Sequence, residues 1–278
     1  MSACRDPPKI ALVAPPTSFH SVRMDFIDAA HFEAILPFIA VGFGAQLIDG
    51  ALGMAFGVIS NTLLVSVLGV PPSRASAGVH LVEMYTTAAS GISHAFHKNI
   101  DWKLFGRLVI PGVIGGIAGA YLLVNLDASV TRPIVMAYLS IIGIMLFARS
   151  FGIPSQRKTP RFIAPLGLVG GFLDAAGGGG WGPVVTSNLL IQGTEPRRTI
   201  GTVNTAEFFL TVTVSITFII GLGFEAFTEA TIGLLIGGVA AAPLGAFLAK
   251  RVPTMLLLRL VGIVLIATSI FSLYRALS

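Results

Sequence analysis

Charged residues are missing from long parts of this 278-residue chain, and their absence limits what it can fold into. No Asp, Glu, Lys or Arg occurs in the stretches 50–73, 108–126, 133–148, 175–194, 208–224, 230–249 and 260–274. Each is close to the roughly 17–25 apolar residues that cross a bilayer as a helix. Only 11% of all residues are charged, against about 25% in soluble domains. An all-α polytopic membrane protein is therefore predicted, because a helix satisfies its own backbone polar groups in lipid.

The remaining composition argues against other classes of protein. The net charge of +5 comes from Lys and Arg in short loops between apolar stretches, which indicates membrane topology rather than nucleic-acid binding. Cys4 is the single cysteine, so neither an internal disulfide nor a cysteine metal cage is expected. Residues 1–34 are more polar than the rest and are interpreted as an interfacial lead-in. No metal, cofactor or nucleic acid is expected as a partner.

The chain also resembles itself, because blocks of sequence recur in the same order at nearly constant spacing. "IDGALGMAFG" at 48–57 parallels "LDAAGGGGWG" at 173–182, and "PSRASAGVHLVE" at 72–83 parallels "PRRTIGTVNTAE" at 196–207. Polar residues coincide as well, which apolar composition alone does not produce: Asp49 with Asp174, Asn61 with Asn188, Arg74 with Arg198, and Glu83 with Glu207. The chain is interpreted as a duplication, with a first repeat at 35–150, a linker at 151–162 and a second repeat at 163–278.

Each half holds five apolar segments, and the first two of each half are short enough to be half-spans of a broken hairpin. They are 35–48, 50–69, 76–96, 106–126 and 131–149 in the first half, and 163–174, 178–193, 200–220, 230–249 and 256–276 in the second. An odd number of crossings per half would invert the second repeat. In that arrangement, the Lys and Arg residues are distributed more unequally between the two sides of the membrane than they would be with parallel repeats. We therefore expect inverted repeats with both termini outside.

Glycines interrupt the apolar segments at places where a helix would otherwise continue. Gly and Pro cost a helix interior about 1 and about 3 kcal/mol, so "GGGGWGP" at 177–183 predicts a broken helix. Paired breaks at a repeat interface are how many transporters build a midplane site, since helix N-termini offer N–H groups and partial positive charge. An amide shortly after each break can donate to an oxyanion. The candidate substrate-binding residues are Gly53, Asn61, Gly177, Gly178, Gly179, Gly180, Trp181, Pro183 and Asn188.

Each of these residues also has a structural explanation, which the sequence leaves open. Small residues are common where membrane helices pack closely, and this explanation is preferred for the glycines at 112, 115, 116 and 119. Asn61 and Asn188 can equally hydrogen-bond between helices, and Trp181 can equally be a core aromatic.

Ionisable residues inside apolar segments form a second group of candidates, because charge at membrane depth is costly and usually functional. One Asp precedes each break, one Glu lies in the third segment of each half, and a histidine lies one helical turn before the first Glu. The candidates for proton coupling, with helix capping or ion pairing as alternatives, are Asp49, Asp174, His80, Glu83 and Glu207. Two arginines open the third segments, where they would guide anions or anchor the loop: Arg74 and Arg198.

The duplicated order of an Asp, a glycine-rich break, an Asn and a "P-x-R-(x)8-E" stretch resembles the TauE/SafE family of sulfite exporter permeases. The resemblance covers residues 35–276, almost the whole chain. It implies a multi-pass permease of the plasma (inner) membrane for sulfite, organosulfonates or other small anions. Asp49, Gly53 and Asn61 match the family's first glycine-rich segment, although "GALGMAFG" lacks the glycine run followed by Pro. Gly177 to Gly180, Pro183 and Asn188 match its second segment.

The leading hypothesis is a secondary transporter that exports a small anion by alternating access at a site between the repeats. Proton coupling through Glu83, Glu207 or His80 is a further hypothesis, and a homodimer is left open. The alternative is a cation or proton channel or carrier that uses the intramembrane carboxylates as ligands. An integral membrane enzyme is disfavoured, because neither an HExxH pattern nor a nucleophile elbow is present, and no Walker motif indicates ATP drive.

Overall fold

The computed structural model describes residues 29–52, 54–152, 160–227, 229–251 and 253–277, and in these residues every regular element is a helix. The first half contains α1 (Ala29–Leu52), α2 (Phe56–Ser66), α3 (Pro72–Phe96), α4 (Trp102–Asn125) and α5 (Ala128–Arg149). The second half contains α6 (Ile163–Gly177), the π-helical segment η1 (Trp181–Thr186), α7 (Ser187–Ile191), α8 (Pro196–Leu222), the short 3-10 turn η2 (Phe224–Ala226), α9 (Glu229–Arg251) and α10 (Thr254–Leu277).

The two halves follow the same order of helices, as the repeated sequence blocks predict. Thus α1 corresponds to α6, α2 to η1 with α7, α3 to α8, α4 to α9 and α5 to α10. The first two segments differ most from the sequence prediction, since α1 begins at Ala29 inside the predicted lead-in and continues to Leu52, and α2 begins only at Phe56. Glu33 and His31 lower the local hydropathy near the start of α1, so charge-free length alone places that start too late.

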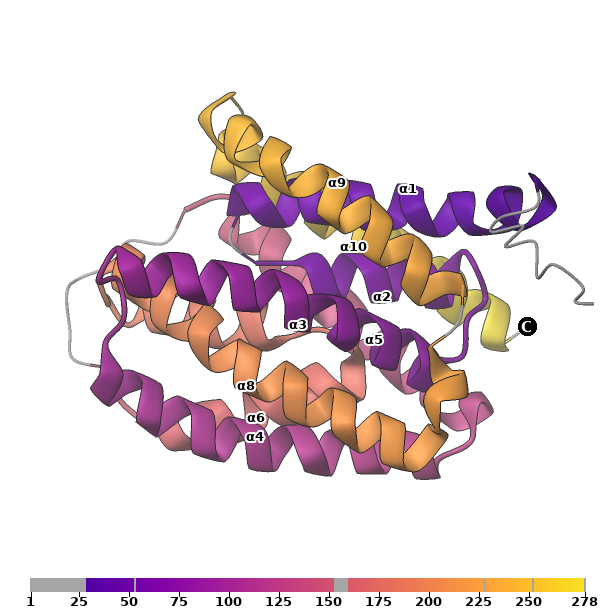
Figure 1. Cartoon of the computed structure of the whole chain (residues 1–278), viewed down its shortest axis with the longest axis horizontal. Helices are drawn as coiled ribbons and strands as arrows, with labels where there is room; N and C mark the ends of the chain where they lie inside the picture. Colours follow the sequence, from indigo (N-terminus) through magenta and orange to yellow (C-terminus); the bar gives the residue numbers. More distant parts are fainter. Residues whose placement is uncertain (1–28, 53, 153–159, 228, 252, 278) are drawn as a thin grey trace, which may run out of the picture.

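The main helix pairs form between the two halves rather than within them. Helix α1 runs along α9, and α6 runs along α4, with α3 and α8 packed between these two pairs (Figure 1). Helix α5 packs against α10. The first helix of each half therefore packs against the fourth helix of the other half.

Glycines make this exchange of helices sterically feasible. A Cβ added to Gly115 would overlap the Leu168 carbonyl of α6, and one added to Gly171 would overlap Gly112. In the corresponding α1–α9 pair, a Cβ on Gly237 would overlap the Ile39 carbonyl. The packing explanation preferred for the glycines of 112–119 fits these contacts, because only a residue without a side chain permits backbones to approach this closely.

Several of these helices have the length and composition of membrane spans. Within the described residues, Trp102–Asn125, Ala128–Arg149 and Arg198–Leu222 are long and apolar enough to cross a membrane. The shorter apolar helices are Phe56–Ser66, Ile163–Gly177, Glu229–Ala242 and Leu258–Tyr274. The fold is thus an all-helical bundle with the apolar character that the sequence predicts.

Candidate functional site

The first helix break separates α1 from α2 and is closed by an aspartate. Helix α1 ends at Leu52, and Ala55 takes a left-handed conformation with φ of 106° before α2 starts at Phe56. The side chain of Asp49 reaches over the break, and its Oδ1 accepts a hydrogen bond from the Phe56 N–H at 3.0 Å. The carboxylate thereby satisfies one of the N–H groups that a helix start leaves without a partner in its own helix.

The second break repeats this construction with glycines in the connection. Helix α6 ends at Gly177, and Gly178 and Gly179 have positive φ angles of 69° and 140°, which glycine adopts without steric cost. Oδ1 of Asp174 accepts a hydrogen bond from the Trp181 N–H at 2.8 Å. In both breaks the acceptor and the donor lie seven positions apart in the chain. The two halves therefore share a cap geometry as well as a sequence pattern.

The two breaks touch each other in the interior of the protein. A Cβ added to Gly57 would lie 2.9 Å from the Gly179 Cα, and one added to Gly182 would lie 2.7 Å from the Met54 Cβ. A Cβ on Gly179 would overlap the Val58 nitrogen. All four glycines from Gly177 to Gly180 are buried. The crossing of the backbones explains why glycine occurs in both segments at this depth.

Side chains behind the second break hold it in place. Asn61 Nδ2 donates a hydrogen bond to the Gly177 carbonyl at 2.7 Å, and a Cβ on Gly178 would overlap the Asn61 side chain. The Tyr138 hydroxyl donates to the Gly179 carbonyl at 3.1 Å. Asn61 thus contacts the glycines of the second break and does not line the pocket. Tyr138 is not predicted from the sequence, because one aromatic hydroxyl in an apolar segment is also typical of a membrane interface.

A pocket of about 580 Å³ lies where the two breaks meet. The first break contributes residues from Met54 to Val58, and the second contributes Gly179, Gly180, Gly182 and Pro183. Four carboxylates also line it: Asp49, Glu83, Asp174 and Glu207. Among the described residues that line the pocket there is neither Lys nor Arg. The pocket therefore combines two helix starts with an acidic wall.

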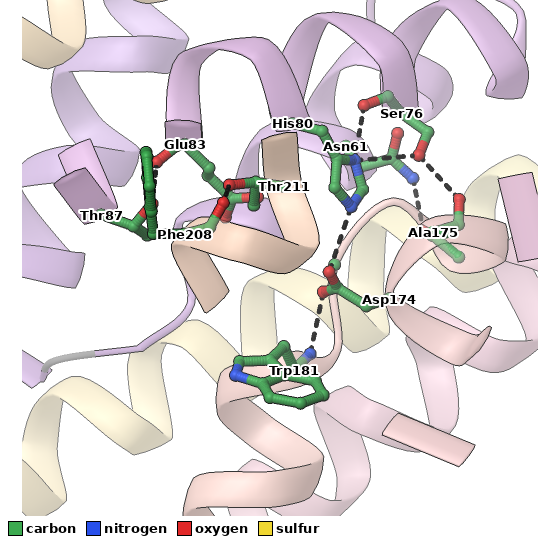
Figure 2. A network of polar contacts seen from close by, with 12 residues as sticks. Asn61, Ser76, His80, Glu83, Thr87, Asp174, Ala175, Trp181, Phe208 and Thr211 are labelled. Carbon is green, nitrogen blue, oxygen red and sulfur yellow. Dashed lines mark hydrogen bonds and ion pairs between the residues drawn. The ribbon is translucent and has the colours of Figure 1, made fainter. Parts of the chain in front are cut away.

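His80 belongs to this site but has a different partner from the one that its sequence position suggests. The predicted His–Glu relay with Glu83 is not observed. Instead, His80 Nε2 lies 3.1 Å from Asp174 Oδ2, and Nδ1 lies 2.7 Å from the Ser76 carbonyl (Figure 2). The reason is tertiary, since α3 packs against α6 and brings His80 to the carboxylate that caps the second break.

The expected position of Asn188 beside the glycines is corrected by the structure. Asn188 is exposed, and its Oδ1 accepts a hydrogen bond from Gln192 Nε2 at 2.6 Å. Asn61 follows the helix start at Phe56 by five residues, whereas Asn188 follows Trp181 by seven, which turns it to roughly the opposite face at 3.6 residues per turn. Thr186 occupies the position equivalent to Asn61 and is buried, with no partner for Oγ1 among the described residues. Counting from Asp174 the same number of residues that separates Asp49 from Asn61 would have identified Thr186.

The remaining candidates fall into three groups. Trp181 is fully buried and donates from Nε1 to the Val203 carbonyl at 3.1 Å, so it packs behind the pocket. Arg74 and Arg198 are exposed in the first turns of α3 and α8 and do not line the pocket. Gly53 lies outside the described residues.

Comparison with known proteins places this arrangement in a family. The sequence matches the profile of the sulfite exporter TauE/SafE family over residues 38–272. The chain belongs to the TauE/SafE family. Over 242 residues it is 41% identical to a protein of Bacillus subtilis (strain 168) named probable membrane transporter protein YtnM, covering 83% of this chain and 79% of the Bacillus protein. No solved structure matches the chain significantly. TauE/SafE membership and the apolar helices together make this an integral membrane protein.

Proposed function

We propose that the protein is a secondary transporter that moves a small anion, such as sulfite or an organosulfonate, through the pocket between the two helix breaks. The observation that carries the proposal is that one break from each half meets the other at a single cavity. A site shared by two repeats can open to one side or to the other when one repeat moves against its partner. The family's name and the name of the Bacillus relative supply the substrate class, the outward direction and the membrane-transporter role.

The helix starts at the pocket favour an anion as the ligand. Helix α2 begins at Phe56, and the helical segment of η1 and α7 begins at Trp181, so two N-terminal ends lie at the cavity. A helix N-terminus carries partial positive charge and backbone N–H groups that bind oxyanions. Gly179 and Gly182 line the cavity with backbone alone, since neither has a side chain.

The acidic wall of the pocket indicates that the anion is accompanied by protons. Asp49, Glu83, Asp174 and Glu207 would repel an anion if all four were ionised, and the described lining residues include neither Lys nor Arg to offset them. Oε2 of Glu83 is buried and has no hydrogen-bond partner among the described residues. A proton on such a group removes the repulsion and supplies a donor. We therefore infer proton-coupled transport.

The packing of the helices supports inverted repeats and alternating access. The α1–α9 and α6–α4 pairs are equivalent, and the two aspartate caps have the same spacing. Both features are expected for two repeats related by a two-fold axis. With an odd number of crossings in each half, the repeats would be inverted and both termini would lie on one side, which the distribution of Lys and Arg predicts to be the outside.

A cation or proton carrier is the second candidate, and the four carboxylates specifically favour it. In this alternative the acidic side chains bind the transported cation directly, and the helix breaks serve only to let the repeats move. The two candidates differ in what crosses the membrane, so a flux measurement separates them.

Flux of radiolabelled sulfite into proteoliposomes tests the proposed function. We expect saturable sulfite uptake that methanesulfonate competes for, because both anions present oxygens to the helix starts. Protein-free liposomes control for passive leakage. Sodium or proton flux that neither requires sulfite nor responds to it would instead establish the cation carrier.

A further inference from the structure

His80 and Asp174 form a buried pair beside the second break. His80 lies on α3 and is fully buried, and Asp174 lies on α6 with a relative exposure of 1%. Their contact, Nε2 to Oδ2, measures 3.1 Å. The other carboxylate oxygen of Asp174 accepts the Trp181 N–H that starts the helical segment after the break. The pair is therefore connected directly to the backbone that forms the pocket.

The hydrogen bonds around His80 determine where one of its protons lies. Nδ1 is 2.7 Å from the Ser76 carbonyl, which can only accept, so Nδ1 carries a hydrogen. The Ser76 hydroxyl donates to the Ala175 carbonyl at 2.8 Å, so its hydrogen is already used. Its oxygen, 3.3 Å from Nδ1, can then only accept from the ring. Figure 2 shows this chain of contacts from Ser76 through His80 to Asp174.

It follows that one more proton must lie between Nε2 and Oδ2. With Nδ1 protonated, a neutral ring presents a lone pair at Nε2, and an ionised carboxylate presents lone pairs at Oδ2. Two acceptors at 3.1 Å without water would repel each other, so the contact requires either an imidazolium with a carboxylate or a neutral ring with a carboxylic acid. Both states hold a single shared proton and have no net charge.

The surroundings of the pair connect this proton to the pocket. Asp174 lines the cavity and His80 does not, so a departing proton leaves through the carboxyl group. Glu83 on α3 and Glu207 on α8 line the same cavity as Asp174. The ring of Phe218 from α8 lies 6.1 Å from the His80 ring and shields it.

We propose that His80 and Asp174 are the proton-binding site of the transport cycle, which takes up one proton from the pocket and returns it there. The proposal rests on the proposed transport function and names its coupling site. When the proton leaves, the contact between the two side chains is lost, and the cap that Asp174 places on the second break is released from α3. Proton occupancy and the geometry of the pocket then change together.

The pair joins the two halves, and among the described residues it has no counterpart at the equivalent positions of the repeat. In the repeat, the position of His80 is taken by Asn204, whose Nδ2 donates to Ser90 Oγ at 3.0 Å. Asp49 caps the first break as Asp174 caps the second, but in the described residues it has no histidine partner. This difference explains why the histidine–aspartate pair occurs once among the described residues of a duplicated chain.

Sulfite accumulation in proteoliposomes under a pH gradient tests the proposal. A gradient of about one pH unit supports about tenfold more accumulation when one proton accompanies each anion. Asp174→Asn keeps an acceptor for Trp181 and offers an N–H to His80 without a titrating proton. We expect this variant to retain sulfite exchange at equal pH and to lose gradient-driven accumulation. Asp127→Asn is the matched control, because Asp127 is exposed at the start of α5 and does not line the pocket, and it should keep the accumulation ratio.

The outcomes distinguish a failure of the proposed coupling site from a failure of the proposed transport function. If the Asp174→Asn variant accumulates sulfite to the wild-type ratio, the coupling role is overturned. His80→Gln is the second variant, and it should show the same loss of accumulation. If both variants lose exchange as well, the pair is only structural and the proposal fails. If the wild-type protein itself exchanges no sulfite, the proposed function is refuted instead.

Discussion

Gly179→Ala should abolish most sulfite transport while leaving the protein folded. The residue has φ of 140°, where side chains are strained, and an added Cβ would overlap the Val58 nitrogen of the other break. Such strain costs about 1–3 kcal/mol. A change of about 1.4 kcal/mol corresponds to tenfold in an equilibrium constant. We therefore expect uptake in proteoliposomes to fall at least about tenfold.

Gly44→Ala is the matched control for this substitution. Gly44 lies within α1, and an added Cβ would meet nothing within 4 Å, so the same chemical change occurs without a collision. It should transport at the wild-type rate. Wild-type uptake by a monodisperse Gly179→Ala protein would show that contact between the two breaks is not needed for transport.

Asp174→Ala should destabilise the protein much more than Asp49→Ala, although the two residues are equivalent in the repeats. Removing Asp49 leaves one backbone N–H without its acceptor, which costs about 1–3 kcal/mol. Removing Asp174 leaves the Trp181 N–H without its acceptor and also leaves buried His80 without its carboxylate partner. Breaking a buried pair costs about 3–5 kcal/mol. The apparent unfolding temperature in detergent measures the difference.

Asp174→Asn adds to this comparison, because an amide of the same shape can keep the hydrogen bonds to Trp181 and to His80. It should regain most of the stability lost in Asp174→Ala. If the two alanine variants unfold at the same temperature, the contact of His80 with Asp174 contributes nothing to the stability of the folded state. That result would contradict a proton shared between these two side chains.

Much of the fold could be predicted from the sequence because its signals are local. Charge-free length marks a membrane helix wherever it occurs, and the predicted segments coincide with the helices of both halves. The crossing of α1 to α9 and of α6 to α4 has no comparable local signal. It depends on contacts such as Gly171 against Gly112, which bring together residues far apart in the chain.

The candidate site shows where local reasoning fails. The repeated aspartates and glycines predicted the two breaks, because backbone irregularity at membrane depth is tolerated only inside protein or against a cavity. Asn188 was misplaced because the π-helical segment η1 and the two additional residues change the helical phase. His80 was assigned to Glu83 because that residue is one turn away in sequence, whereas Asp174 reaches it through tertiary packing. The functional roles of all these residues stay predictions.

Hydrogen exchange of the backbone, measured with and without sulfite, tests whether the anion binds at the two helix breaks. We propose that the anion lies between these breaks, held by backbone N–H groups. Sulfite should therefore slow exchange in peptides that cover 54–58 and 178–183 together. Exchange at Leu126, in the connection between α4 and α5, should be unaffected. Saturable sulfite binding that protects neither break, or only one of them, would contradict the account.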